Sequence, residues 1–120
     1  MDQSHVLGMV CGYYLSRETD AYEDLGMGNQ RQTHQALGKA LGVPARSIQN
    51  WRDEFDPVHD TPRKGWRNRE MAPSRRRLIE LLGSYDPSEL YALVNDAIKS
   101  PLGPLAQSFL AVAWDVDSHR

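Results

Sequence analysis

The chain has 120 residues and a formal net charge of −2; 40% of the residues are hydrophobic, 25% are charged, and one is a cysteine, Cys11. These values are typical of one globular domain, and they exclude a disordered tail, an internal disulfide, a cysteine-rich zinc cluster and a uniformly basic nucleic-acid binder. Since the N-terminus lacks a basic leader and no window approaches the roughly 20 apolar residues of a membrane span, we expect a cytoplasmic protein without membrane contact.

Apolar residues at three- and four-residue steps predict an all-α domain over residues 1–120, because no segment alternates apolar and polar residues as a strand does. We expect five to six short helices, the first over about residues 4–15. Cys11 lies in its apolar part, which favours a buried thiol over a reactive one. Ser16 is expected to cap a short second helix that ends at Gly26.

Residues 1–55 are expected to contain a helix-turn-helix. Its helices, at about residues 30–41 and 45–55, are joined by a tight turn in which Gly42 suits the left-handed conformation that ends a helix. We expect small and apolar side chains to pack the two helices together: Ala36, Leu37, Ala40, Leu41, Val43, Ile48, Trp51 and Phe55. This arrangement presents the start of the second helix to the major groove of DNA.

Four polar side chains of the second helix are predicted to point outward and to read base edges: Arg46, Ser47, Gln49 and Asn50. Arginine can donate two hydrogen bonds to O6 and N7 of guanine, and the amide of Gln or Asn can pair with N6 and N7 of adenine. Three acidic residues at the end of this helix, Asp53, Glu54 and Asp56, argue against DNA because they would repel phosphates. The open alternative is a helix pair that binds protein.

Residues 56–73 show no periodicity and carry proline and glycine, so we expect an extended basic segment before the C-terminal helices. Between Arg63 and Arg77 there are seven cations and one acid, a charge of +6 that leaves −8 for the rest of the chain. Six of these cations are predicted to bind DNA phosphates: Arg63, Lys64, Arg67, Arg69, Arg75 and Arg76. For any one of them, ion pairing with the protein's own carboxylates is the alternative.

Residues 74–116 are expected to form the C-terminal helices. Ser74 is predicted to cap the first of them, and Asp86 and Glu89 are predicted to form a capping box at the start of the next. The last helix is apolar over a wide arc. It is therefore either buried in the core or part of a homodimer interface.

We find no catalytic or metal-binding signature, and we expect neither an enzyme nor a cofactor. The four histidines are scattered, and the aspartates beside His59 are more typical of turns than of a metal site. Asp53, Glu54 and Lys64 are residue types of a nuclease site, but such carboxylates project from strands and these lie at a helix end.

The sequence SIQNWRDEFDP, followed by RKGWRNRE and then PSR, resembles a small helical module of bacterial restriction and mobile-element proteins. The resemblance covers about residues 36–77, and RDEFDP with RKGW downstream is its most specific part. In those proteins the module typically lies beside a nuclease or another effector domain. The resemblance implies a role in DNA defence or counter-defence.

Three hypotheses follow. The first is a helix-turn-helix protein that binds double-stranded DNA, as a small regulator or accessory factor in a phage, mobile-element or defence setting. The second is a protein–protein adaptor or inhibitor of a nucleic-acid-processing complex, whose acidic body or basic segment meets a partner of opposite charge. The third is an auxiliary domain for an enzyme encoded nearby.

Overall fold

The computed structural model describes residues 3–59, 71–100 and 103–113, and every regular element in these ranges is a helix. The elements are α1 (Gln3–Arg17), α2 (Ala21–Leu25), α3 (Gln30–Leu41), α4 (Ala45–Phe55), the 3₁₀ helix η1 (Asp56–Val58), α5 (Pro73–Leu82), α6 (Pro87–Lys99) and α7 (Pro104–Val112). The all-α prediction is confirmed for this part of the chain, with seven α-helices rather than five to six. None of these helices combines the length and apolarity needed to cross a bilayer.

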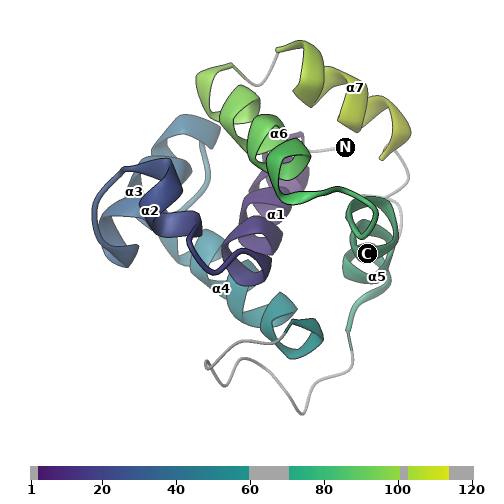
Figure 1. Ribbon diagram of the computed structural model, residues 1–120, viewed down its shortest axis with the longest axis horizontal. Coiled ribbons are helices and arrows are strands. Elements are labelled where there is room, and N and C mark those ends of the chain that lie inside the picture. Colours follow the sequence, from purple (N-terminus) through teal and green to yellow (C-terminus); the bar gives the residue numbers. More distant parts are fainter. Residues whose placement is uncertain (1–2, 60–70, 101–102, 114–120) are drawn as a thin grey trace.

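Helix α1 lies at the centre of the molecule, and α3, α4, α6 and α7 pack around it (Figure 1). Every residue from Val6 to Ser16 is buried, which is the pattern of a helix enclosed on all sides rather than along one stripe. Cys11 lies in this stretch with 0% of its surface exposed, as predicted. Burial raises the pKa of its thiol to about 12.

Two glycines allow α1 to approach α4 closely. A Cβ atom on Gly12 would lie 2.6 Å from Cβ of Trp51 and 2.9 Å from the backbone nitrogen of Arg52, and a Cβ atom on Gly8 would overlap the Trp51 ring. The indole therefore fills the space that a side chain at Gly8 would occupy, and the backbone of α4 fills the space at Gly12. Sequence analysis gave neither glycine a role.

Helix α7 is buried on one side and exposed on the other. Ala106, Phe109 and Leu110 belong to the core, whereas Leu105 and Val112 are 47% and 55% exposed. The apolar arc of this helix is thus only partly covered by the described part of the molecule. A homodimer through α7 stays a prediction.

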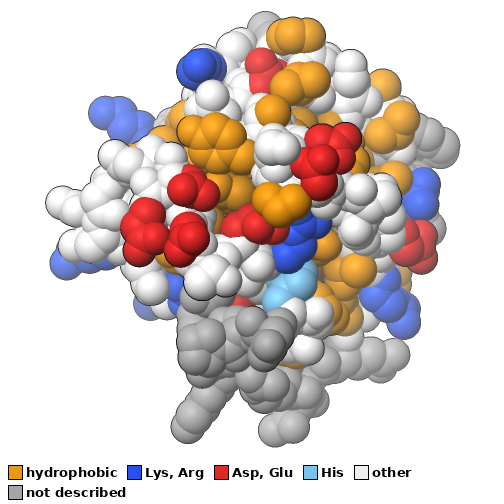
Figure 2. All heavy atoms as spheres, in the orientation of Figure 1, with side chains coloured by type: hydrophobic (Ala, Val, Ile, Leu, Met, Phe, Trp, Pro, Cys, Tyr) orange, Lys and Arg blue, Asp and Glu red, His pale blue; other side chains and the backbone are white. Residues whose placement is uncertain are grey.

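Acidic side chains gather over α2 on the left of Figure 2. Asp20, Glu23 and Asp24 are all exposed there. Part of the negative charge outside residues 63–77 is therefore concentrated in one surface patch.

Two of the predicted helix caps are wrong. Ser16 does not cap the second helix, because α1 continues past it and α2 begins after Asp20; the predicted end of α2 at Gly26 is confirmed. Ser74 does not start α5, because Pro73 occupies the first position of that helix, where its fixed φ and missing N–H are tolerated. Both serines are buried instead of exposed at helix ends.

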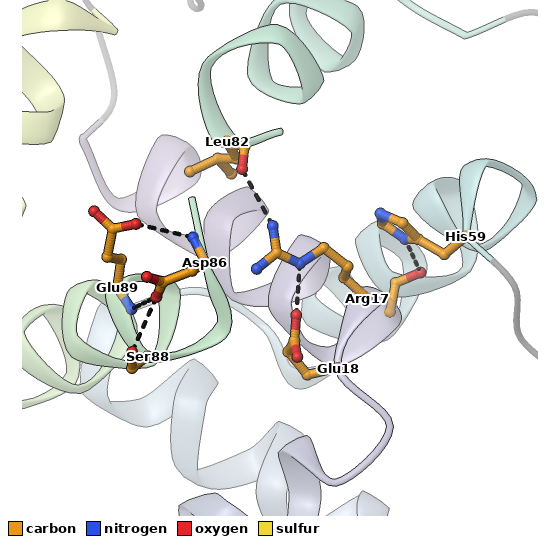
Figure 3. A network of polar contacts seen from close by, with 8 residues as sticks. Arg17, Glu18, His59, Leu82, Asp86, Ser88 and Glu89 are labelled. Atoms are coloured by element: carbon orange, nitrogen blue, oxygen red, sulfur yellow. Dashed lines mark hydrogen bonds and ion pairs between the residues drawn. The ribbon is translucent and has the colours of Figure 1, made fainter. Parts of the chain in front are cut away.

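The predicted capping box of α6 is confirmed (Figure 3). The Asp86 carboxylate accepts a hydrogen bond from the backbone N–H of Glu89 at 2.8 Å, and the Glu89 carboxylate accepts one from the N–H of Asp86 at 3.0 Å. Asn29 and Gln32 form the same reciprocal pair at the start of α3, which sequence analysis did not identify. Each pair satisfies two backbone donors that a helix leaves unpaired.

Candidate nucleic-acid interface

Helices α3 and α4 pack against each other across the three-residue turn at positions 42–44. Gly42 has a φ of 75°, in the left-handed region that favours glycine, so α3 ends there as predicted. Apolar side chains from both helices and the turn are buried: Leu37, Leu41, Val43, Ile48, Trp51 and Phe55.

The residue that lets the turn approach α3 is Gly38. A Cβ atom at this position would lie 2.5 Å from the carbonyl oxygen of Val43 and 3.1 Å from the backbone nitrogen of Ala45. Ala36 and Ala40, which were expected at this contact, are only half-buried. The path of the chain from α3 into α4 therefore depends on a missing side chain.

The outer face of α4 separates two surface hollows, and the four predicted base-reading residues divide between them. Arg46 and Gln49 line a hollow of about 390 Å³ shared with α3. Ser47 and Asn50 line a groove of about 640 Å³ shared with η1 and α5. Arg46 and Gln49 are exposed and the other two are half-buried. Within the described residues none of the four side chains forms a hydrogen bond or ion pair.

The hollow on the α3 side also contains residues that sequence analysis missed. Arg31 and Gln35 of α3 line it together with Arg46 and Gln49, and all four are exposed. Two guanidinium groups thus share one concave surface with three amides, the third being that of Gln30. The predicted helix-turn-helix could have indicated Arg31 and Gln35, because in DNA-binding proteins with this motif the first helix crosses the DNA backbone.

Two of the six predicted phosphate-binding cations, Arg75 and Arg76, lie in the described residues, and they differ in whether they form an internal ion pair. Nε of Arg75 lies 3.1 Å from a carboxylate oxygen of Glu54, and its NH1 donates to the Ser74 hydroxyl at 2.7 Å. Internal ion pairing is thus observed for this arginine. Arg76 is exposed and has no ion pair within the described residues. The other four, Arg63, Lys64, Arg67 and Arg69, lie outside the described residues.

The three carboxylates at the end of α4 are all engaged by the protein. Asp53 accepts hydrogen bonds from the Arg52 guanidinium, the shorter at 2.8 Å, and Glu54 pairs with Arg75. Asp56 is fully buried and accepts a hydrogen bond from the Ser16 hydroxyl at 2.7 Å. Their repulsion of an approaching phosphate is therefore weaker than the sequence alone suggests.

Arg52 joins three helices from a buried position. Its NH1 donates to the Tyr22 hydroxyl of α2 at 2.9 Å and to Oε1 of Gln30 in α3 at 3.1 Å, and the Tyr22 hydroxyl lies 2.7 Å from Nε2 of His34. Burial lowers the pKa of Arg52, but its bonds to Asp53 and Tyr22 outweigh burial and the pKa is raised. The charged guanidinium thus holds α4 in place against α3.

Ser16, Asp56 and His59 form a second polar cluster, between α1 and η1. The Ser16 hydroxyl donates to Asp56 at 2.7 Å. It also lies 2.8 Å from Nδ1 of His59, and this contact at His59 is drawn in Figure 3. In a serine-hydrolase relay the histidine lies between the serine and the aspartate, whereas here the serine lies between the other two. The bonds therefore anchor η1 to α1. Residues 56–58, the first of the predicted extended basic segment, are thus helical rather than extended.

Comparisons with protein-family models, with curated proteins and with solved structures found no match to this chain. Any functional conclusion therefore depends on the residues and their arrangement.

Proposed function

We propose that the protein binds double-stranded DNA, with α3 and α4 acting as a helix-turn-helix and α4 as the recognition helix. In this proposal it is a small regulator or accessory factor in a phage, mobile-element or DNA-defence setting, and it catalyses no reaction. The setting is supported by the sequence resemblance, and the binding mode by the geometry around α4.

The observation that carries the proposal is that the outer face of α4 lies between two hollows with arginines on their walls. An α-helix with its side chains is about 10–12 Å wide, and the major groove is about 12 Å wide and is bordered by two phosphate backbones. A helix inserted there needs cations on both sides. Arg31 supplies one on the α3 side, and Arg76 supplies one on the α5 side.

Each residue then has a defined role. Arg46 and Gln49, which have no partner within the described residues, are available for guanine and adenine edges, and Asn50 and Ser47 extend the reading surface toward α5. Phosphate contacts come from Arg31 and Arg76. Arg75 and the predicted cations at positions 63–69 add to this set in the proposal.

We test the proposal by selecting from randomised duplexes and then measuring binding by fluorescence anisotropy across salt concentrations. Each phosphate contact contributes a slope of about −0.9 to a plot of log K against log salt, so we expect a total slope of several units. Arg31→Ala should weaken binding to all sequences and reduce the slope by about one, because it removes a phosphate contact. The double variant Arg46→Ala/Gln49→Ala should lose discrimination between sequences.

Lys39→Ala is the matched control. Lys39 is an exposed cation of α3 that lines neither hollow, so its removal should leave affinity close to that of the unmodified protein. Absence of binding to every duplex, or equal losses in Arg31→Ala and Lys39→Ala, contradicts the proposal.

A second candidate is an adaptor or inhibitor that binds a basic surface of a nucleic-acid-processing complex. The exposed acidic patch of Asp20, Glu23 and Asp24 favours it, because clustered carboxylates resemble a row of phosphates. Its test is a pull-down from nuclease-treated lysate with the unmodified protein and with Glu23→Lys/Asp24→Lys. A partner that the unmodified protein retains and the variant loses supports the adaptor, and retention by both contradicts it.

A further inference from the structure

The groove between α4 and α5 has a composition that DNA reading alone does not explain. Its volume of about 640 Å³ lies within the range of about 300–1,000 Å³ that is usual for small-molecule sites. Helix α4 lines it with Ser47 and Asn50 on its polar face, and η1 and α5 supply further lining residues.

Most of the groove is apolar. Trp51, Val58, Met71 and Ile79 line it, and Val58 is 48% exposed. Large apolar side chains are exposed at only two other positions of the described chain, both on α7. An apolar body placed in the groove would therefore remove from water a surface that the fold leaves uncovered.

The polar groups of the groove favour an anion. Its one carboxylate, on Glu54, is already paired with Arg75 at 3.1 Å, so these two charges offset each other. Arg76 contributes a guanidinium with no ion pair in the described part of the chain, and the side chains of Ser47 and Asn50 are neutral hydrogen-bonding groups. The uncompensated charge of the groove is thus positive.

We propose that this groove is a binding site for a small organic anion with an apolar body, such as an aryl or alkyl carboxylate or sulfonate. The anionic head would accept hydrogen bonds from Arg76 and from the Asn50 amide, and the apolar body would lie against Trp51, Val58 and Ile79. The site rests on the groove itself and requires no DNA.

A consequence for regulation rests on the proposed function. Ser47, Asn50 and Arg76 belong both to the proposed DNA surface and to this groove, so a bound anion would take the groups that DNA needs. The ligand and the duplex are therefore expected to compete, which would make the protein a ligand-controlled DNA binder.

The first experiment titrates the whole protein with anilinonaphthalene sulfonate, a fluorescent aryl sulfonate, without DNA. We expect saturable binding of one probe per chain. Val58→Ser and Arg76→Gln should each weaken it, the latter about tenfold because a hydrogen bond to a charged group is lost. Val112→Ser and Lys39→Gln are the matched controls, because they change an equally exposed valine and an exposed cation outside the groove.

Equal weakening in Val58→Ser and Val112→Ser overturns the site, because the probe then binds exposed apolar surface in general. Displacement of the probe by an acidic, apolar peptide but not by decanoate also overturns it and assigns the groove to a protein partner. Circular dichroism melts of each variant verify that the fold is retained.

The second experiment adds the selected duplex to the probe-bound protein. Probe release with increasing duplex supports competition, and unchanged DNA affinity at saturating probe overturns the regulatory step. If the probe binds in the groove but no duplex binds, the proposed DNA function fails while the anion site stands. The two failures are thus distinguishable.

Discussion

Tyr14 and Tyr22 differ in how their hydroxyl groups are satisfied. Tyr14 of α1 is 1% exposed, and its hydroxyl has no hydrogen-bond partner within the described residues. The Tyr22 hydroxyl accepts a hydrogen bond from Arg52 and lies 2.7 Å from His34. A buried polar group without a partner lowers stability, whereas one that completes a network raises it.

The same substitution should therefore have opposite effects at these two positions. Tyr14→Phe removes an unsatisfied hydroxyl and is expected to raise the free energy of unfolding by about 1 kcal/mol. Tyr22→Phe removes one acceptor of the Arg52 guanidinium and the hydroxyl partner of His34, and it is expected to lower the free energy of unfolding by about 1–3 kcal/mol. Urea denaturation of both variants measures these changes. A loss of stability in Tyr14→Phe comparable to that in Tyr22→Phe would contradict the assignment.

Among the elements, α6 owes its start to one carboxylate. The backbone N–H of Glu89 and the hydroxyl of Ser88 both bond Asp86, and they hold the pKa of Asp86 below its ordinary value of 3.8. Because this pKa is lower in the folded state than in the unfolded one, the stabilising effect is fully present above pH 3.8. It is lost as the pH falls through the folded value.

Asp86→Ala is therefore expected to lower the melting temperature at pH 7, and its difference from the unmodified protein should shrink as the pH falls below about 4. Asp86→Asn keeps an amide oxygen for the cap but does not titrate, so it should melt close to the unmodified protein at pH 7 and show no such shrinkage. Thermal melts from pH 7 to pH 2 measure both. A pH-independent deficit in Asp86→Ala would show that the ionised carboxylate has no part in the cap.

The limits of α3, α4 and α6 were predictable because their signals are local. Gly42, which ends α3 three residues before α4 begins, and the Asp86–Glu89 pair act on the chain within four residues of where they stand. The predicted caps at Ser16 and Ser74 were wrong because serine occurs both at helix N-caps and inside helices. Which of the two occurs depends on the residues that pack against it, and these are not known from the sequence.

The candidate site was predictable only along one helix. The outward position of Arg46 and Gln49 follows from the apolar period of α4. Arg31 joins Arg46 through the angle at which α3 meets α4, and that angle depends on the contact of Gly38 with the turn. The sequence shows a glycine at this position, but it does not show which backbone atoms the glycine allows to approach.

At the scale of the whole molecule, the single cysteine reports on the core. Cys11 is fully buried in α1, which most of the other helices contact, and its thiol pKa is raised to about 12. At pH 8 the folded thiol is thus both inaccessible and almost entirely protonated. Only an opening that exposes the centre of α1 makes it reactive.

We therefore expect iodoacetamide to label the folded protein only as fast as the whole molecule unfolds. The free energy of opening obtained from labelling rates at pH 8 should match the value from circular dichroism and show the same dependence on urea. The urea-unfolded chain, with an ordinary thiol pKa of about 8.5, supplies the reference rate. Fast labelling without urea would show that α1 opens locally.

The contact of α1 with α4 at Gly8 and Gly12 has a mechanical consequence. At Gly12 no side chain of α1 separates the two backbones, and at Gly8 only the packed Trp51 ring does, so a tilt of α1 is transmitted to α4 as a rigid displacement. The angle at which Arg46 and Gln49 meet another surface is thus governed from the opposite side of the helix. Adaptation of this protein to a new target can begin at residues that never touch it.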